Sequence, residues 1–122
     1  MAVVYVLELA HGRWYVGASL ERNFARRTSA HFSGTGAVWT RVYRPLRVVE
    51  VVKGGDYIVE NAVTKRYMQR YGIDRVRGGA YCTLRFDART LAFLDAELAA
   101  SAALAAPTTS AALAAPNLPA PA

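Results

Sequence analysis

Apolar residues near the N-terminus follow the alternation that is typical of strands. Residues 3–9 (VVYVLEL) and 13–16 (RWYV) are rich in valine, leucine and tyrosine, and the turn AHG between them contains Gly12, which tolerates a positive φ. This pattern predicts a β-hairpin. Because successive side chains of a strand point to opposite faces, Tyr5 falls on a mostly apolar face together with Leu7.

Helical and strand patterns continue along the rest of the chain. We expect helices over residues 20–32, 57–71 and 88–100, and a third strand over residues 45–52. Asp56 is placed to cap the second helix, and Gly72 to end it in a left-handed conformation. The third helix has Asp87 as its candidate cap and carries leucines at three positions of one face.

The predicted order is hairpin, helix, strand, helix, helix. It corresponds to an α+β domain, an α/β-type sandwich in which a small, three-stranded, mainly antiparallel sheet is flanked by three helices. All 15 basic and 9 acidic residues lie at or before Glu97, and the near repeat SAALAAP follows at residues 101–107 and 110–116. We therefore expect one globular domain over residues 1–98 and a flexible or partly helical Ala/Pro-rich tail over residues 99–122.

Charge indicates the class of partner. The net charge is +6, and 13 of the 15 basic side chains are arginines, whose planar fork suits bidentate contacts to phosphate. Arginine enrichment through genome composition would give the same bias without nucleic-acid binding. No run of about 20 apolar residues and no secretory leader pattern occurs, so we expect a cytoplasmic protein without membrane contact, nucleoid-associated if bacterial. Cys82 is the single cysteine, which excludes an intramolecular disulfide.

Common catalytic motifs are absent from the sequence, which contains no P-loop, GxGxxG, HExxH or GxSxG. Isolated polar residues within structured segments remain as candidates: Tyr5, Tyr15, Arg27, His31 and Glu60. Taken singly, each has an ordinary structural explanation. A strand tyrosine packs with its hydroxyl at the rim, a helix arginine is solvated, a helix histidine packs, and a glutamate in a first turn is favoured by the helix dipole.

Taken together, these residues resemble the signature of the GIY-YIG nuclease superfamily. VVY at residues 3–5 stands where GIY belongs, and YVG at residues 15–17 stands where YIG belongs, and the two tyrosines are ten positions apart. The resemblance then runs through these residues: Arg26, Arg27, His31, Gly34, Gly36, Thr40, Arg41, Pro45 and Glu60. It ends in YGIDRVRGG, which is similar to a stretch ending in NVRGG in some relatives. The chain departs from the pattern at Val3 and Val4, and at Arg75, where relatives often carry an asparagine.

The resemblance implies a metal-dependent endonuclease that hydrolyses phosphodiester bonds in DNA. Glu60 would hold one divalent cation, Mg²⁺ or Mn²⁺. Tyr5 would be the general base, and nearby positive charge would have to lower its pKa from about 10. Arg27 would pair with the scissile phosphate, and Tyr15 would hold a phosphate or water. His31 would orient Tyr5 or transfer a proton, and Gly17 would have a structural role.

A basic and aromatic run, WTRVYRPLR, would flank such a site and bind the DNA backbone or stack on bases. The expected nucleic-acid contacts are Arg26, Trp39, Arg41, Arg44, Arg47, Arg75 and Arg77. The DNA could be duplex, branched or single-stranded, and a homodimer or a targeting protein could direct the cutting. Two alternatives stay open: a binding module of the same fold that no longer cuts, and an adaptor whose basic face docks an acidic protein.

Overall fold

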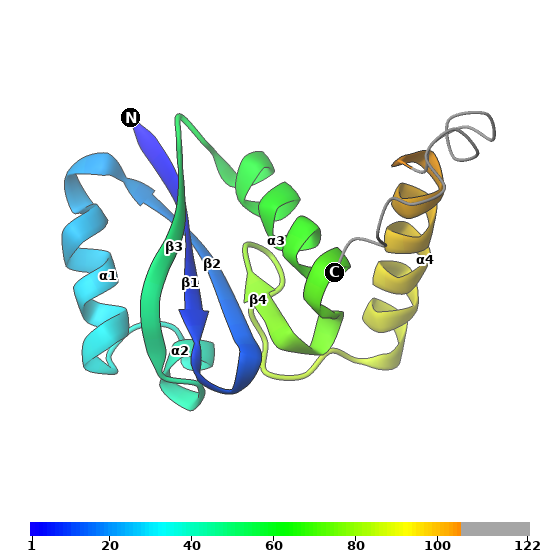
Figure 1. Cartoon of the computed structure of the whole chain (residues 1–122), viewed down its shortest axis with the longest axis horizontal. Helices are drawn as coiled ribbons and strands as arrows, with labels where there is room; N and C mark the ends of the chain where they lie inside the picture. The colour runs from blue at the N-terminus through cyan, green and yellow to red at the C-terminus, as the bar shows by residue number, and fades with distance from the viewer. Residues whose placement is uncertain (106–122) are drawn as a thin grey trace, which may run out of the picture.

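The computed structural model describes residues 1–105 of the chain (Figure 1). The elements are β1 (Ala2–Leu9), β2 (Arg13–Leu20), α1 (Phe24–Ser33), α2 (Val38–Val42), β3 (Pro45–Lys53), α3 (Tyr57–Tyr71), β4 (Val76–Gly78) and α4 (Ala88–Ala105), with 3₁₀ turns η1 (Ala10–Gly12), η2 (Glu21–Asn23) and η3 (Ile73–Arg75). The predicted α+β class is confirmed. Two short elements, α2 and β4, were not predicted, because five and three residues are too few to show a period.

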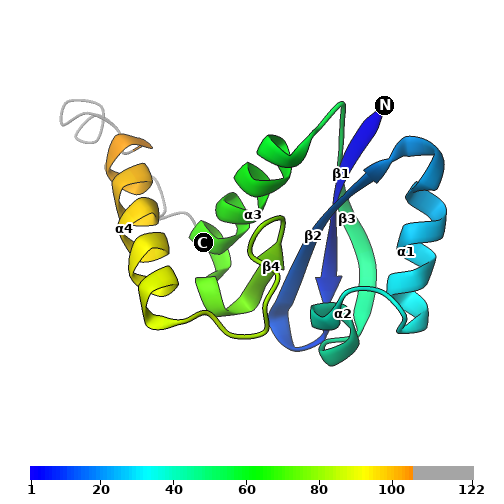
Figure 2. The same ribbon diagram turned by 180° about the vertical axis from the view of Figure 1, so that it is seen from behind.

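The sheet has four strands in the order β3-β1-β2-β4, not the three that the sequence predicted. β1 pairs antiparallel with both β2 and β3, whereas β4 pairs parallel with β2 over Trp14–Val16 alone. The sheet is therefore mixed. Helices α1 and α2 lie on one side of it and α3 on the other, with α4 beyond α3 (Figures 1 and 2).

Alternation along β1 builds a core on each face of the sheet. Tyr5 and Leu7 pack with Trp39 of α2 and with Phe24 of α1, as their predicted common face requires. Val4, Val6, Val16 and Val63 form the cluster on the α3 face. These two clusters fix the positions of α1 and α3 relative to the central hairpin.

The predicted caps account for the start of α3 and of α4. Oδ1 of Asp56 accepts the backbone amide protons of Ile58 and Val59 at 3.0 and 3.2 Å, and Oδ1 of Asp87 accepts that of Thr90 at 2.7 Å. The expected left-handed cap at Gly72 is wrong, because its φ of 105° is combined with an extended ψ of 146°.

Two boundaries differ from the prediction. The chain from residue 20 to residue 23 finishes β2 and forms η2, so α1 begins at Phe24. At the other end α4 continues to Ala105, because alanine and leucine are strong helix formers. The first part of the expected tail is thus helical, and residues 106–122 lie outside the described part of the chain. Within residues 1–105, no helix has the length and apolarity needed to cross a membrane.

Candidate active site

The sheet has a gap at the edge of β2, because β4 ends opposite Val16. The next residue, Gly17, therefore has no β4 partner, and side chains from both faces of the sheet meet beside it. Arg27 approaches from α1, and Glu60 from α3. The charges of both side chains act on the pKa of Tyr5 and of Tyr15, so all four groups lie within electrostatic range of one another. We call this place the edge site.

All five predicted catalytic residues converge at the edge site. Tyr5 comes from β1, Tyr15 from β2, Arg27 and His31 from α1, and Glu60 from α3. The ring centroids of Tyr5 and Tyr15 lie 5.8 and 4.9 Å from that of His31. The consecutive elements β1, β2 and α1 and the more distant α3 thus all contribute polar groups to the edge site.

Gly17 has a steric role in this arrangement. It is the β2 partner of Tyr5, and the Tyr5 ring lies across its backbone. A Cβ atom at residue 17 would lie 2.6 Å from both Cζ and Oη of Tyr5, well inside van der Waals contact. Glycine is therefore needed there for the tyrosine to reach His31.

A buried hydrogen-bond chain runs from Tyr5 through His31 to Thr40. Oη of Tyr5 lies 2.8 Å from Nε2 of His31, and Nδ1 of His31 lies 3.2 Å from Oγ1 of Thr40. The amide of Ala37 points at Nδ1 from 3.4 Å. Oγ1 of Thr40 in turn donates its proton to the carbonyl of Ala37 at 2.8 Å. The loop and α2 thus hold the imidazole ring against Oη of Tyr5.

Burial shifts the pKa values of the side chains around this hydrogen-bond chain. The pKa of His31 falls from 6.5 to about 4 because burial disfavours its charged form and Arg27 repels it. His31 is therefore neutral at pH 7. Burial also raises the pKa of Tyr15, and the neighbouring charges of Tyr5 and Glu60 add to the rise.

The expectations for Tyr5 need correction. Its side chain has no exposed surface, so its hydroxyl does not lie at an open rim. Its pKa is raised and not lowered, because burial outweighs the charge and hydrogen bond of Arg27. In the protein alone Tyr5 is a neutral phenol.

Glu60 is the acidic group of the edge site. Its half-buried side chain has a raised pKa, because desolvation outweighs the backbone amide of Gly79 and the charge of Arg27. Within residues 1–105, no three His, Cys, Asp or Glu side chains gather in a way that could hold a metal ion. A lone carboxylate suits Mg²⁺, which keeps several of its waters and takes its remaining ligands from a substrate phosphate. The donor set thus fits one weakly held hard cation at Glu60.

Two of the expected nucleic-acid contacts are structural instead. Trp39 is 4% exposed, and its Nε1 donates to the carbonyl of Trp14 at 3.0 Å, so its ring is not free to stack on a base. Arg77 is 3% exposed and lies against the rings of Trp39 and Phe86. Its guanidinium donates to four backbone carbonyls, those of Ile73, Val76, Thr83 and Leu84.

Three other expected contacts, Arg44, Arg47 and Arg75, lie toward the hairpin turn, away from Gly17. Arg47 pairs with Glu8 at 2.6 Å on the face of β1 opposite to Tyr5. Arg41 and Arg44 are exposed, and the carbonyl of Arg44 accepts the amide of Ala10 in the turn. Nη1 of Arg75 lies 3.0 Å from the position of a Cβ at Gly12, so Arg75 is at the turn too. Arg26 is exposed beside Arg27 on α1, next to the edge site.

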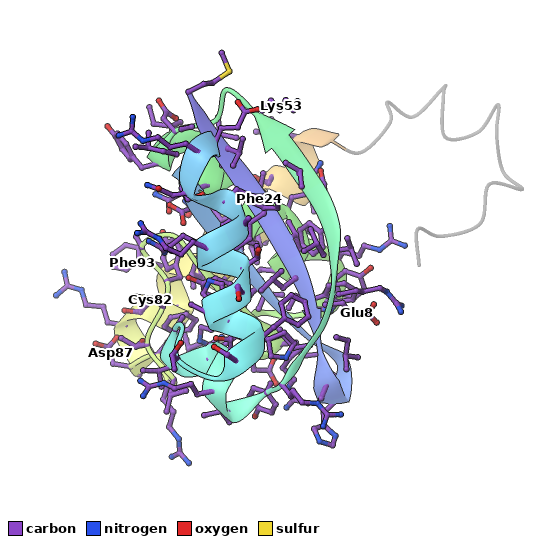
Figure 3. The ribbon with its side chains drawn as sticks, turned by 90° about the vertical axis from the view of Figure 1, so that its left-hand side faces the viewer. Glu8, Phe24, Lys53, Cys82, Asp87 and Phe93 are labelled. Carbon is purple, nitrogen blue, oxygen red and sulfur yellow. The ribbon has the colours of Figure 1, made fainter. Side chains whose placement is uncertain are left out.

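Figure 3 shows that Glu8, the partner of Arg47, and the loop after β4 lie on opposite sides of the molecule. Viewed from the α1 side, with the sheet behind that helix, Glu8 lies on one side of α1, and the loop residues Cys82 and Asp87 lie on the other. Cys82 is near enough to the edge site for its charge to raise the pKa of Tyr15. The loop after β4 therefore borders the site, whereas the side chain of Arg47 points to the opposite side.

Some residues of the site had no assigned role in the sequence. In the sequence, Thr40 was noted only as part of the resemblance to GIY-YIG nucleases, yet in the structure it completes the hydrogen bonds of His31. Gly36 allows the loop to pass over that ring, because a Cβ there would overlap Nδ1 of His31. Gly79 belongs to the unpredicted turn after β4. The VRGG segment was the available signal for it, since paired glycines mark a tight turn.

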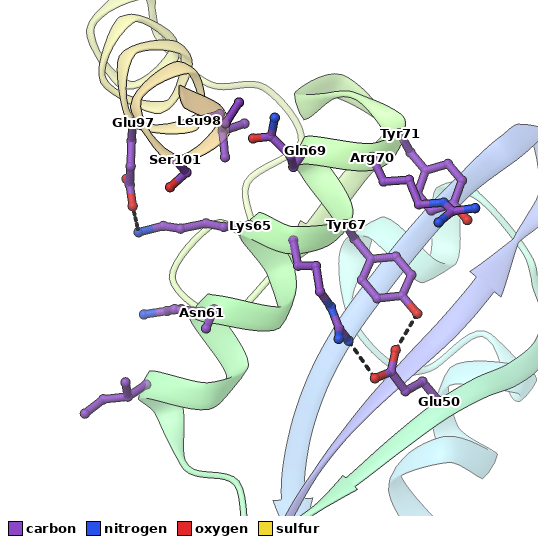
Figure 4. A pocket seen from close by; sticks show the side chains of 14 residues that line it. Glu50, Asn61, Lys65, Tyr67, Gln69, Arg70, Tyr71, Glu97, Leu98 and Ser101 are labelled. Carbon is purple, nitrogen blue, oxygen red and sulfur yellow. Dashed lines mark hydrogen bonds and ion pairs between the residues drawn. The ribbon is translucent and has the colours of Figure 1, made fainter. Parts of the chain in front are cut away.

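A separate groove lies between α3 and α4, with a volume of about 1000 Å³ (Figure 4). The ion pair of Lys65 with Glu97 crosses it at 2.7 Å, and Tyr67 donates to Glu50 at one end. None of the five residues of the edge site lines this groove. Its size does not make it the reactive site, because its acidic groups already have cationic or hydroxyl partners.

No protein-family model, curated protein or solved structure matches the chain. The residues of the edge site and their chemistry are therefore the basis for a proposed function.

Proposed function

We propose that this protein is a metal-dependent endonuclease that hydrolyses phosphodiester bonds in DNA. The main support is the convergence at the edge site of two tyrosines, an arginine, a histidine and a glutamate from four elements. Cleavage of a phosphodiester requires an activated water and positive charge next to the phosphate. Tyr5 and His31 supply the first kind of group, Arg27 the second, and the net charge of +6 favours a polyanion.

Arg27 is the group that meets the phosphate first. Its side chain is exposed, whereas the Tyr5 hydroxyl that it contacts is buried. A scissile phosphate would compete for the guanidinium, because a charged bidentate pair is stronger than its contact with a neutral phenol. In this proposal, movement of Arg27 onto the phosphate uncovers the Tyr5 hydroxyl, and Tyr5 becomes accessible only with substrate in place.

Tyr5 would then act as the general base and accept the proton of the attacking water. Nε2 of His31 is hydrogen-bonded to Oη of Tyr5 and would exchange a proton with it, and Thr40 and Ala37 hold the imidazole ring in that position. Glu60 would hold one Mg²⁺ or Mn²⁺. When bound, such an ion supplies positive charge that lowers the pKa of nearby water and tyrosine and neutralises a phosphate oxygen. Tyr15 remains a neutral phenol that can donate to a phosphate oxygen.

The burial of Tyr5 also favours a second candidate function. A base with no exposed surface and a raised pKa is what a DNA-binding module of this architecture, without cleavage, would have. The half-buried carboxylate of Glu60 argues for the nuclease instead. A pure binder of phosphates gains nothing from a negative charge whose desolvation costs free energy beside its own arginine.

Nicking of supercoiled plasmid in Mg²⁺ or Mn²⁺ tests the proposal. Wild type is compared with Glu60→Gln, which keeps the shape of the side chain and removes its charge. Asp95→Asn, an exposed acid on α4, is the matched control. We expect metal-dependent nicking by wild type and by the control, and none by Glu60→Gln. A plasmid that is shifted on a gel but nicked by none of the three would replace the nuclease with the binding module.

A further inference from the structure

The turn that follows β4 is held tightly against α3. Gly78 and Tyr81 exchange two backbone hydrogen bonds, of 2.9 and 2.8 Å, so Gly79 and Ala80 form the tip of a tight turn. Gly79 has a φ of 54°, which favours glycine. A Cβ at Gly78 would lie 2.8 Å from Oγ1 of Thr64, so the turn has no room to move toward the helix.

Two neighbouring side chains of α3, those of Asn61 and Glu60, face the backbone amides of this tip. Oδ1 of Asn61 accepts the amide proton of Ala80 at 2.9 Å. The backbone amide of Gly79 lies beside the carboxylate of Glu60, close enough to lower its pKa. A Cβ at Gly79 would overlap Oδ1 of Asn61, so glycine at this position is what allows Asn61 to reach the turn.

The other end of the segment is held by other side chains. Arg77 donates to the carbonyls of Thr83 and Leu84 at 2.6 and 2.9 Å, which anchors the chain beyond Tyr81 on β4. Lys65 of α3 lies over the ring of Tyr81, 5.4 Å from its centroid. Asn61 is the side chain that bonds the tip itself, at Ala80 beside Gly79.

We propose that Asn61 is a positioning residue of the edge site, which holds the Gly79 amide against the Glu60 carboxylate and thereby orients that carboxylate. A carboxylate on a helix can rotate about several bonds. An amide fixed on one of its oxygens leaves the other oxygen directed away from the turn. This inference rests on the proposed function, because it is Glu60 that Asn61 serves.

The substitution Asn61→Ala removes the acceptor, and alanine is the better helix former, so a general loss of helix stability is not expected. Asn61→Asp keeps an oxygen in the same place and should restore the turn. We expect Asn61→Ala to lower kcat by about tenfold or more, as loss of an outer-shell partner of a metal ligand does, with DNA affinity unchanged. Asn61→Asp should retain most of the wild-type rate.

Two measurements do not depend on turnover. Hydrogen exchange at the Ala80 amide should be faster in Asn61→Ala than in wild type and restored in Asn61→Asp, because its acceptor is lost and regained. Binding of Mn²⁺ alone, followed by its electron paramagnetic resonance signal, should weaken by about tenfold in Asn61→Ala. It should be lost in Glu60→Gln.

The outcomes separate this inference from the proposed function. Loss of nicking in Glu60→Gln with wild-type kcat in Asn61→Ala would overturn the role of Asn61 and leave the nuclease standing. Nicking by Glu60→Gln at the wild-type rate would overturn Glu60 as the metal ligand, and with it the role of Asn61, although the protein would still be a nuclease. If wild type does not nick, Mn²⁺ binding decides: weaker binding in Asn61→Ala supports the positioning role, and equal binding, or none in wild type, overturns it.

Discussion

Lowering the pH should destabilise this protein through His31. The side chain is 2% exposed, and its pKa falls from 6.5 to about 4 in the folded state. The folded pKa lies below the unfolded one, so the unfolded chain binds the proton first. The stability that His31 contributes is therefore complete above pH 6.5 and is lost as the pH falls toward 4. The loss is about 2 kcal/mol between pH 7 and pH 5, and about 3 kcal/mol by pH 4.

Urea denaturation at several pH values measures this loss. The matched variant is His31→Gln, whose amide can still reach Oη of Tyr5 but does not titrate. Carboxyl groups contribute in both proteins, for example Glu50, whose pKa is lowered by its hydrogen bond from Tyr67. The difference in pH dependence between wild type and variant therefore isolates the histidine.

A second measurement uses the wild-type protein alone and so does not depend on how well the variant folds. The ring proton shifts of His31 in wild type should titrate well below pH 6, with a midpoint near the value of 4. Titration near 6.5, or an equal loss of stability in wild type and His31→Gln between pH 7 and 5, would refute the reasoning. Either result would mean that His31 is hydrated, and the assigned chain from Tyr5 to Thr40 would be wrong.

Four further predictions follow from the contacts at and around the edge site. Gly17→Ala should cost about 1–3 kcal/mol in urea denaturation, because its Cβ would overlap the Tyr5 ring, and a change below the error of the measurement would contradict that packing. Tyr5→Phe should abolish plasmid nicking while thermal unfolding stays cooperative; full activity would exclude Tyr5 as the base. Arg77→Lys should expose the loop after β4 to limited proteolysis, since one ammonium cannot serve four carbonyls, and an unchanged cleavage pattern would argue against the clamp. Arg26→Ala should reduce the slope of log K for DNA against log salt by about 1, whereas Arg75→Ala, at the hairpin turn, should leave it unchanged, and equal effects would place the DNA elsewhere.

The sequence by itself determined the local elements and the contents of the site. Alternation along β1 put Tyr5 on the face with Leu7, and Asp56 marked the start of α3, because both features depend on neighbours in the chain. The five polar residues could be selected as a set from their order and spacing. Their convergence could not be derived from composition or periodicity, and the resemblance alone anticipated it.

The tertiary structure decided which groups are accessible and how they ionise. The sequence predicts surface contacts at Arg77 and Trp39, but both are buried, because the short strand β4 pairs parallel with β2 and places Arg77 against Trp39 of α2. The same pairing stops at Val16 and leaves the edge beside Gly17 at which Glu60 and Arg27 meet. Pairing between distant segments depends on how the whole chain packs, and burial then sets the pKa of Tyr5 and His31. No window of neighbouring residues contains that information.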